Sequence, residues 1–552
     1  MNDLANNTAG LPPPSVEQTL ELSPSQTKYL LLGLTLATAM EFYTFESMNL
    51  VLPDIAGILG LSFDEASWIL TIYSSFLFLG VPFSIWLAGH YGYKRFLMWT
   101  TALFALMSVG TASSATFRIM LFLRALEGLA GAGLIMWWRA GIYLIMPKPQ
   151  RSPSMMRAST GLYLASASGL LLSGFLTDHI SWRLICVPNV LLGVAALWLL
   201  HHNFPDLPRS ESQRLQHTDG VGLCLLAAGI LLLQIILSRG HIDGWLESPH
   251  IRFLAVISAA SLIAFIRWEL SADNRYPLME MSLLKNRNVL TGVLIGLLTG
   301  MILSGSLFVL PEFLRLVDSQ THSATQTGRL LAFYALTAAA LRPLLSGLVA
   351  RYGQRKIAAV AVCMLISSML LLYRSLTNST PDCYFLLPLA LYACCVTMLL
   401  PSVGSGTVGR LDQHNLLDGV SLYITFRQFG ASLGVASLTI LLQNRETLHS
   451  SRLYEHLNSA NETTSTMLDL VSRYTSVYGG ADTHGGALRS IALLSRHSAH
   501  QVEVLSYADC FLFMAMVGGI TLVLIPLMSP FVPSKLPSQP KFGLREVENS
   551  YS

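Results

Sequence analysis

Long apolar runs recur along this chain, and each is long enough to cross a membrane as a helix. A helix needs roughly 20 residues to span about 30 Å of hydrocarbon, and about fourteen such runs lie between residues 29 and 531. The runs are much longer than the alternating segments of about ten residues that build a membrane β-barrel. Together with 52% hydrophobic and 12% charged residues, they predict an all-α polytopic membrane protein of about 14 transmembrane helices.

Lysine and arginine gather in the loops that face the cytoplasm if the N-terminus lies inside. Lys94 and Arg95 lie in one such loop and Arg355 and Lys356 in another, whereas the outer loops are poor in both residue types. Because positive residues stay on the cytoplasmic side, we expect a multi-pass protein of the inner or plasma membrane with both termini cytoplasmic. The polar stretch 444–507 carries five arginines, but it is long enough to escape this rule and is predicted to be an extracytoplasmic loop.

Two stretches of the chain are near copies of each other: WLAGHYGYKRFLMW at residues 86–99 and GLVARYGQRKIAAV at residues 347–360. Each places a glycine, Gly92 or Gly353, between two apolar runs, where glycine permits a tight turn between antiparallel helices. The basic residues beside these glycines would hold each turn at the anionic cytoplasmic surface. They are Lys94, Arg95, Arg355 and Lys356. A duplicated helical bundle explains the repeat.

The two turns resemble a loop signature of the major facilitator superfamily, G-x-L-A-D-R-x-G-R-K, and the resemblance extends over nearly the whole chain. The stretch RALEGLAGAG is similar to the fourth-helix motif of that family at Arg124, Gly128 and Gly131. The stretch GLLLSG keeps Gly169 and Gly174 of the fifth-helix motif of its antiporters. The number of spans resembles the 14-helix drug:proton antiporter branch. The resemblance implies a transporter whose two repeated turns belong to a cytoplasmic gate.

The chain departs from the family pattern at several positions, so it resembles a divergent member of the family. The aspartate of the loop signature is replaced by Gly89 in the first copy and by Ala350 in the second. Leu170 stands where the fifth-helix motif has proline, which weakens the case for export specifically. The aspartate of the branch's first helix aligns with Thr44.

The resemblance also implies the major facilitator fold of two six-helix bundles. In the 14-helix branch, two extra helices link these bundles. We expect a disordered cytoplasmic tail at 1–28, an N-terminal bundle at 29–201, a linker with two transmembrane helices at 202–288, a C-terminal bundle at 289–532 and a second cytoplasmic tail at 533–552. The first tail is polar and proline-rich and lacks the apolar core of a cleavable signal.

Charged side chains inside the apolar runs mark the candidate transport site, because a charge in hydrocarbon is costly and therefore faces the bundle interior or a water-filled cavity. Asn49 is added because it matches the first-helix ending of the antiporter branch. We expect Glu41 to carry the coupling proton, since it lies nearer the bilayer middle, and Glu46 to bind substrate or pair with an arginine of the fourth helix. The candidates for proton coupling and the substrate cavity are Glu41, Glu46, Asn49, Arg124, Glu127 and Arg139.

These charges also have structural interpretations. At 100° per residue, Arg124 and Arg139 share one face of their helix, which must look inward. Arg124 and Glu127 can instead form a buried pair that fixes helix packing. Packing or capping near helix ends is the favoured role of Arg342, Arg427 and Asp509.

The favoured function is a proton-driven secondary transporter that exports an amphipathic organic compound or drug. ATP is excluded as the direct energy source, because the sequence contains no G-x-x-x-x-G-K-[ST] phosphate loop. One alternative is an exporter of an anionic metabolite, such as a carboxylate siderophore, because arginines can bind an acidic ligand. Another is a membrane scaffold or sensor that keeps the fold without transport.

We expect no enzyme activity, no cofactor and no metal site, because the scattered cysteines and histidines lack ligand spacing. The expected partners are a small-molecule substrate, protons and the lipid bilayer. Similar exporters of two-membrane bacteria suggest a periplasmic adaptor and an outer-membrane channel in addition. Nucleic acid is not expected, because the basic residues form no continuous patch.

Overall fold

The computed structural model of the chain describes residues 23–205, 219–240, 244–271, 273–274, 277–317, 322–377, 380–409, 411, 415–456, 462–479 and 483–528. These residues form helices with short connections and contain no strand. Residues 1–22, 206–218 and 529–552, which include most of both predicted tails and part of the predicted linker, lie outside the described residues. The first helix begins at Pro24, so a helix replaces the last part of the tail predicted at 1–28.

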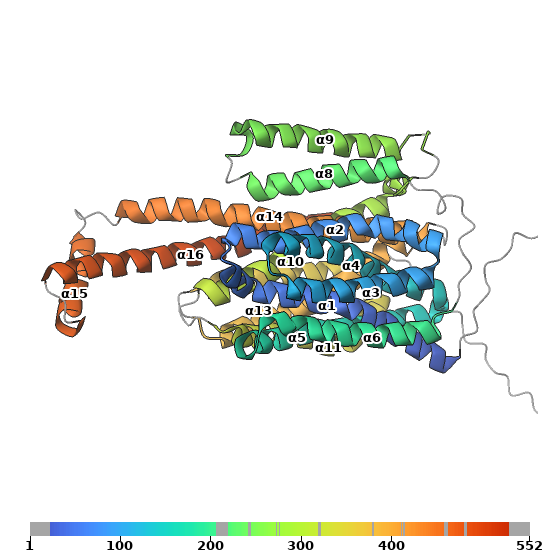
Figure 1. Ribbon diagram of the computed structural model, residues 1–552, viewed down its shortest axis with the longest axis horizontal. Coiled ribbons are helices and arrows are strands. Elements are labelled where there is room, and N and C mark those ends of the chain that lie inside the picture. The colour runs from blue at the N-terminus through green and yellow to red at the C-terminus, as the bar shows by residue number, and fades with distance from the viewer. Residues whose placement is uncertain are drawn as a thin grey trace, which may run out of the picture.

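Most of the helices run along one long axis of the molecule, and α15 lies across it (Figure 1). The α-helices are α1 (Pro24–Leu59), α2 (Phe63–Tyr91), α3 (Tyr93–Ser113), α4 (Phe117–Ile145), α5 (Lys148–His179), α6 (Cys186–Asn203), α8 (Gly220–Arg239), α9 (Pro249–Glu269), α10 (Arg287–Glu312), α11 (Ala324–Tyr352), α12 (Gln354–Ser375), α13 (Cys383–Val408), α14 (Leu416–His456), α15 (Glu462–Gly479) and α16 (Thr483–Leu524). Shorter helical turns are η1 (Trp182–Ile185), η2 (Trp245–Glu247), η3 (Met281–Lys285), η4 (Phe313–Val317) and η5 (Ile525–Leu527).

Thirteen of the described helices are long and apolar enough to cross a membrane. Helix α1, with 36 residues, is not among them, because polar residues such as Glu41 and Glu46 lower its mean hydropathy. It lies against α4, α5 and α6, so many of its polar side chains meet protein instead of lipid. The prediction of an all-α, multi-pass membrane protein is confirmed.

Helices α2 and α11 show the internal repeat in detail. Each begins with a capping box, in which a serine, Ser62 or Ser323, exchanges hydrogen bonds with the residue three positions on. Each contains a proline, Pro82 or Pro343, ten residues before the glycine that ends the helix. The interval from the capping serine to that glycine is 30 residues in both helices. The repeated sequence therefore folds into a repeated element.

The two glycine turns have nearly the same backbone geometry. Gly92 has φ 93° and ψ 140°, and Gly353 has φ 86° and ψ 150°, a region that side-chain-bearing residues adopt only with strain. The N–H of Gly92 donates to the carbonyl of Ala88 at 2.9 Å, and that of Gly353 donates to Val349 at 3.0 Å. The carbonyl of each glycine then accepts the first hydrogen bond of the next helix. Each turn thus joins two helices without a longer loop.

Contacts between helices join the first half of the chain to the second. Helix α5 packs against α11, and α2 packs against α14. Glycines let α5 and α11 approach closely, because a Cβ on Gly174 would meet the backbone of Ala324 and one on Gly328 would meet the backbone of Leu170. Helices α8 and α9 pair with each other at the edge of the bundle, where α8 touches α2 (Figure 1).

The polar stretch 444–507 differs from the predicted loop, because most of its described residues are helical. Helices α14 and α16, of 41 and 42 residues, extend beyond the other helices, with α15 at their far end (Figure 1). Asp509 lies well inside α16, which begins at Thr483, so the prediction that it starts and caps the last helix is wrong. Its carboxylate instead joins the two long helices, with Nε2 of His449 at 2.9 Å and Nε of Arg445 at 3.5 Å.

Candidate functional site

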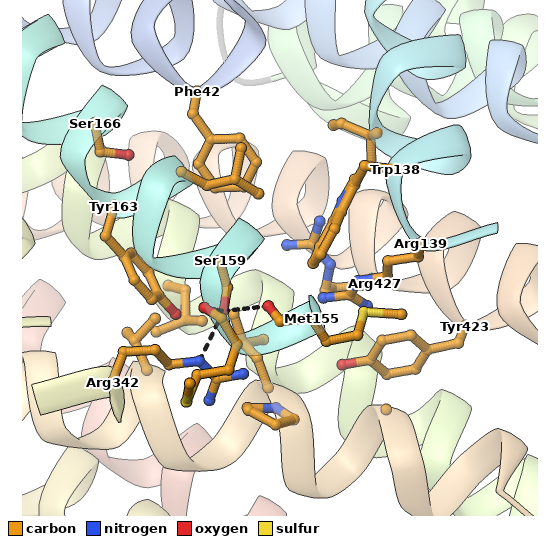
Figure 2. A pocket seen from close by; sticks show the side chains of 18 of the residues that line it. Phe42, Trp138, Arg139, Met155, Ser159, Tyr163, Ser166, Arg342, Tyr423 and Arg427 are labelled. Carbon is orange, nitrogen blue, oxygen red and sulfur yellow. Dashed lines mark hydrogen bonds between the residues drawn. The ribbon is translucent and has the colours of Figure 1, made fainter. Parts of the chain in front are cut away.

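A cavity of about 430 Å³ lies between the two halves of the chain and is lined by α1, α4, α5, α10, α11, α13 and α14. Its size is in the range that holds a drug-sized compound. Figure 2 shows aromatic and apolar side chains around it, including Phe42, Trp138, Met155, Tyr163 and Tyr423. Such walls suit a ligand with an apolar body.

Glu41 and Glu46 both line this cavity, and they are only 5% and 4% exposed. The hydroxyl of Tyr334, on α11, donates to the carboxylate of Glu46, so Glu46 links α1 to the second half of the chain. Glu41 lies more than a turn earlier on α1, next to Tyr73. A Cβ on Gly131 would lie 3.1 Å from the Tyr73 hydroxyl and 3.6 Å from Cγ of Glu41, so the bare glycine leaves room for both side chains.

Asn49 borders a second, smaller cavity of about 30 Å³, together with Glu41, Tyr73 and Gln428. Its side-chain amide donates to the carbonyl of Phe45 at 2.8 Å, within its own helix. Asn49 is therefore near Glu41, but it does not line the large cavity.

Three arginines from three different helices point into the large cavity: Arg139 on α4, Arg342 on α11 and Arg427 on α14 (Figure 2). Nε of Arg342 donates to the hydroxyl of Ser159 at 2.8 Å, and its Nη1 donates to the carbonyl of Thr397 at 2.8 Å. The guanidinium of Arg139 lies 5.0 Å from the centre of the Trp138 ring. Arg342 and Arg427, which were expected to serve packing, therefore also face the site.

Arg124 and Glu127 form an ion pair within α4. Nη1 of Arg124 lies 2.9 Å from Oε2 of Glu127, and both side chains are 0% exposed. The guanidinium of Arg124 also lies 4.1 Å from the centre of the Tyr73 ring. Neither residue lines either cavity. This geometry agrees with the structural interpretation of the pair.

Thr44, at the position of the antiporter aspartate, faces other helices. Its Oγ1 accepts a hydrogen bond from Nδ2 of Asn189, on α6, at 2.6 Å. The same amide donates to the hydroxyl of Ser108, on α3, at 2.9 Å. Position 44 thus ties α1 to α3 and α6, whereas the carboxylates that face the cavity stand at Glu41 and Glu46.

Gly169 and Gly174, the glycines kept from the fifth-helix motif, lie at close helix contacts. A Cβ on Gly169 would lie 2.7 Å from the carbonyl oxygen of Tyr43, and one on Gly174 would lie 2.5 Å from that of Ala324. The first contact joins α5 to α1, and the second joins α5 to α11. Neither glycine lines a cavity, so their observed role is to let helices approach.

The lining of the large cavity extends toward the end of the bundle that carries the glycine turns. Arg151, near the start of α5, and Val408, at the end of α13, belong to this lining. Gln354, directly after Gly353, donates from Nε2 to the hydroxyl of Ser405 at 3.1 Å, and Ser405 lines the cavity. The second turn therefore touches the site through one hydrogen bond.

At the opposite end of the bundle, polar contacts close the two halves against each other. Nη2 of Arg315, in η4, donates to Oδ1 of Asp54, near the end of α1, at 2.9 Å. The carboxylate of Asp178, at the end of α5, accepts from the backbone N–H groups of Ala324 and Thr325 at 3.2 and 2.7 Å. The cavity is thus closed at this end and continues toward the other.

Sequence reasoning missed Tyr334, although the repeat offers a signal for it. Tyr73 and Tyr334 each stand 19 residues before the glycine of their turn, and each lies beside one glutamate of α1. Among the described residues, no group of three His, Cys, Asp or Glu is arranged to hold a metal ion.

The chain is similar to a multidrug export protein over nearly its whole length and to a fatty acid resistance protein over most of it. It is 28% identical to the multidrug export protein EmrB of Escherichia coli (strain K12) over 517 residues, which cover 93% of this chain and 97% of that protein. It is 26% identical to the fatty acid resistance protein FarB of Neisseria gonorrhoeae over 446 residues, or 79% of this chain and 84% of that protein. These similarities confirm the predicted resemblance to the drug transporters.

Solved transporters share the fold. A bacterial homolog of the human lysosomal transporter Spinster, in an inward-facing and occupied conformation, matches with a TM-score of 0.56 and 14% identity over 93% of this chain and 100% of that one. The xylose transporter XylE from E. coli, in a partially occluded inward-open conformation, matches with a TM-score of 0.52 and 12% identity over 89% and 97% of the chains.

A family model matches residues 34–435, which is more than half of the chain, and its description is Major Facilitator Superfamily. The relatives and the fold are those of transporters, not enzymes. This chain therefore belongs to the Major Facilitator Superfamily, as a divergent, multi-pass membrane transporter that is similar to EmrB.

Proposed function

We propose that the chain is a proton-coupled secondary transporter that exports an amphipathic organic compound across the cytoplasmic membrane. The observation that carries this proposal is the cavity of about 430 Å³, which places the buried carboxylates of Glu41 and Glu46 beside apolar and aromatic walls. An amphipathic compound can bury its apolar part against these walls. A carboxylate at the same place can take up and release a proton. The similarity to a multidrug export protein supports export.

Glu41 is the proposed proton site. Glu46 is proposed to couple proton and substrate binding to the movement of the two halves of the chain. Because Glu46 accepts a hydrogen bond from Tyr334 in the other half of the chain, a change at this carboxylate acts directly on the contact between the halves. One charge that crosses 100 mV releases about 2.3 kcal/mol, enough to hold roughly a fortyfold gradient of a neutral compound.

Transport in proteoliposomes tests the proposal. Three labelled probes share one ten-carbon chain: decanesulfonate, decanamide and decyltrimethylammonium. When the interior of the proteoliposomes is acidic, those with wild-type protein should accumulate at least one probe. Glu41→Gln should abolish this accumulation. Glu312→Gln is the matched control, because Glu312 is also buried, at 7% exposed, but lines neither cavity. Accumulation by both Glu41→Gln and Glu46→Gln with unchanged pH dependence would reject this mechanism.

We also propose the predicted orientation and division of the chain. Residues 29–201 and 289–532 form the two bundles, residues 202–288 link them, and both termini face the cytoplasm. The ends of α14 and α16 with α15 then project outside. They are where a periplasmic adaptor, with its outer-membrane channel, would bind.

The second candidate is an exporter of an anionic metabolite, such as a carboxylate siderophore. It is favoured by the charges of the cavity lining, where two glutamates stand against the four arginines Arg139, Arg151, Arg342 and Arg427. The similarity to a fatty acid resistance protein agrees with a substrate that carries a carboxylate. A scaffold or sensor without transport is disfavoured, because it gains nothing from costly charges around a cavity.

A further inference from the structure

We propose that Arg139, Arg342 and Arg427 form a binding subsite for the anionic group of an amphipathic substrate. The inference rests on the proposed transport function and names the substrate class of the same cavity. The three side chains come from α4, α11 and α14 and point into one space, which Tyr163 also faces (Figure 2). The subsite is thus built from both halves of the chain.

In the part of the chain that the structure describes, the three guanidinium groups have no ion-pair partner. Among the described residues, no carboxylate forms an ion pair with any of them. Arg139 is also close enough to Arg342 and to Arg427 for electrostatic repulsion. Like charges held together away from bulk water are costly, and a bound anion would offset that cost.

The two carboxylates of the cavity offset only part of the positive charge of these three arginines. Glu46 accepts its hydrogen bond from Tyr334. Glu41 attracts Arg427 electrostatically, but no hydrogen bond joins the two described side chains. Arg139 and Arg342 have no such neighbour among the carboxylates of the cavity lining.

The arginines also have hydrogen-bond donors to spare. Arg342 is 8% exposed, and its bonds to Ser159 and Thr397 hold the guanidinium in place while leaving its remaining N–H groups for a ligand. Nε of Arg427 is buried and has no hydrogen-bond acceptor in the described part of the chain. A planar guanidinium matches the paired oxygens of a carboxylate, sulfonate or phosphate.

Apolar walls beside the arginines define the rest of the ligand. Phe42, Met155 and Trp138 line the same cavity (Figure 2). A compound with one anionic group and an apolar chain or ring system can therefore satisfy the arginines and bury its apolar part in one binding event. The structure favours such an anion over a cation of the same size.

Equilibrium binding to the purified full chain in lipid nanodiscs, without any proton gradient, tests the subsite. The probes are labelled decanesulfonate, decanamide and decyltrimethylammonium, with binding to empty nanodiscs subtracted. Wild-type protein should bind decanesulfonate at least tenfold more tightly than the other two. Arg139→Gln and Arg427→Gln should each weaken decanesulfonate binding at least tenfold and leave decanamide binding unchanged. Arg267→Gln, an exposed arginine of α9 outside the cavity, should leave all three affinities unchanged.

Equal affinities for the three probes in wild-type protein would overturn the proposal, and so would an anion preference that survives in both glutamine variants. Melting temperatures verify folding, and Arg139→Lys and Arg427→Lys replace any glutamine variant that does not fold. These lysine variants should keep a reduced anion preference, because they retain the charge but lose the planar group. Wild-type protein could transport decyltrimethylammonium with a proton gradient and yet bind the three probes without a preference for the anion. That result would reject the subsite but would leave the proposed function in place.

Discussion

Glu41 and Arg124 both lie next to Tyr73, but their surroundings differ. Glu41 lines both cavities, whereas Arg124 is 0% exposed and paired with Glu127. An unpaired group at a cavity can bind a ligand or a proton, while a paired and enclosed group mainly holds its helix in place. At the scale of single residues, we therefore propose that Glu41 serves transport and that Arg124 serves packing.

The first prediction concerns this pair. Arg124→Met and Glu127→Leu should each destabilise the protein by about 3–5 kcal/mol, because each leaves one buried charge without its partner. The double variant should recover most of that loss and should still transport, since neither residue faces a cavity. Melting temperatures in detergent and proteoliposome uptake measure both effects. A stable double variant without transport would instead give the pair a part in coupling.

At the scale of elements, the turn after α11 requires glycine. Gly353→Ala should cost about 1–3 kcal/mol, because φ 86° strains any residue with a side chain. Gly347→Ala on the same helix is the control, since a Cβ there meets nothing within 4 Å and its backbone needs no positive φ. Only Gly353→Ala should lower the melting temperature. Equal melting temperatures for the two variants would show that the turn tolerates a side chain.

A second element, α15, reports on orientation. Ser465 lies on an exposed face of α15, and Gln354 lies directly after the Gly353 turn. A membrane-impermeant thiol reagent applied to intact cells should label Ser465→Cys and spare Gln354→Cys, because the proposed orientation places them on opposite sides. The reverse labelling pattern would show that the orientation is opposite to the proposed one.

At the scale of the whole molecule, the internal repeat also supplies the ion pair at the closed end of the cavity. Asp54 and Arg315 each stand 38 residues before the glycine of their turn, so equivalent positions of the two halves form the ion pair there. The two side chains are only 25% and 11% exposed and the pair is bidentate, so it contributes more than an exposed surface pair, on the order of 1–3 kcal/mol. A pair of this strength stabilises the closed end, and opening of the transporter at that end requires the pair to break.

Asp54→Asn should therefore favour opening at this end by about fivefold or more. Outside labelling of Leu307→Cys, a position that lines the cavity, should become faster in that background. Asp382→Asn is the control, because Asp382 pairs with His322 within the second half only and should leave the rate unchanged. Unchanged labelling in Asp54→Asn would exclude this pair as part of the closure.

The membrane-spanning architecture was predictable because apolar runs must form helices in lipid. The extension of α14 and α16 was not, since a polar helix outside the membrane leaves no run of apolar residues to detect. Asp509 was misplaced for that reason, because the polar edge of its apolar run looks like a helix start. Arg342 and Arg427 were assigned to packing, since the sequence alone does not show which helix faces meet around a cavity.

The central claim is that the protein exchanges protons for substrate at a carboxylate of the cavity. Measuring proton movement that is driven by a substrate gradient alone tests this claim most directly. Proteoliposomes that contain a pH-sensitive dye start without a pH difference across the membrane. They then receive a gradient of decanesulfonate or decyltrimethylammonium, whichever of these two charged probes the protein transports. Wild-type protein should move protons against the direction of the probe, and Glu41→Gln should abolish this proton movement. Probe transport by wild-type protein without proton movement, or proton movement that persists in both Glu41→Gln and Glu46→Gln, would contradict the account.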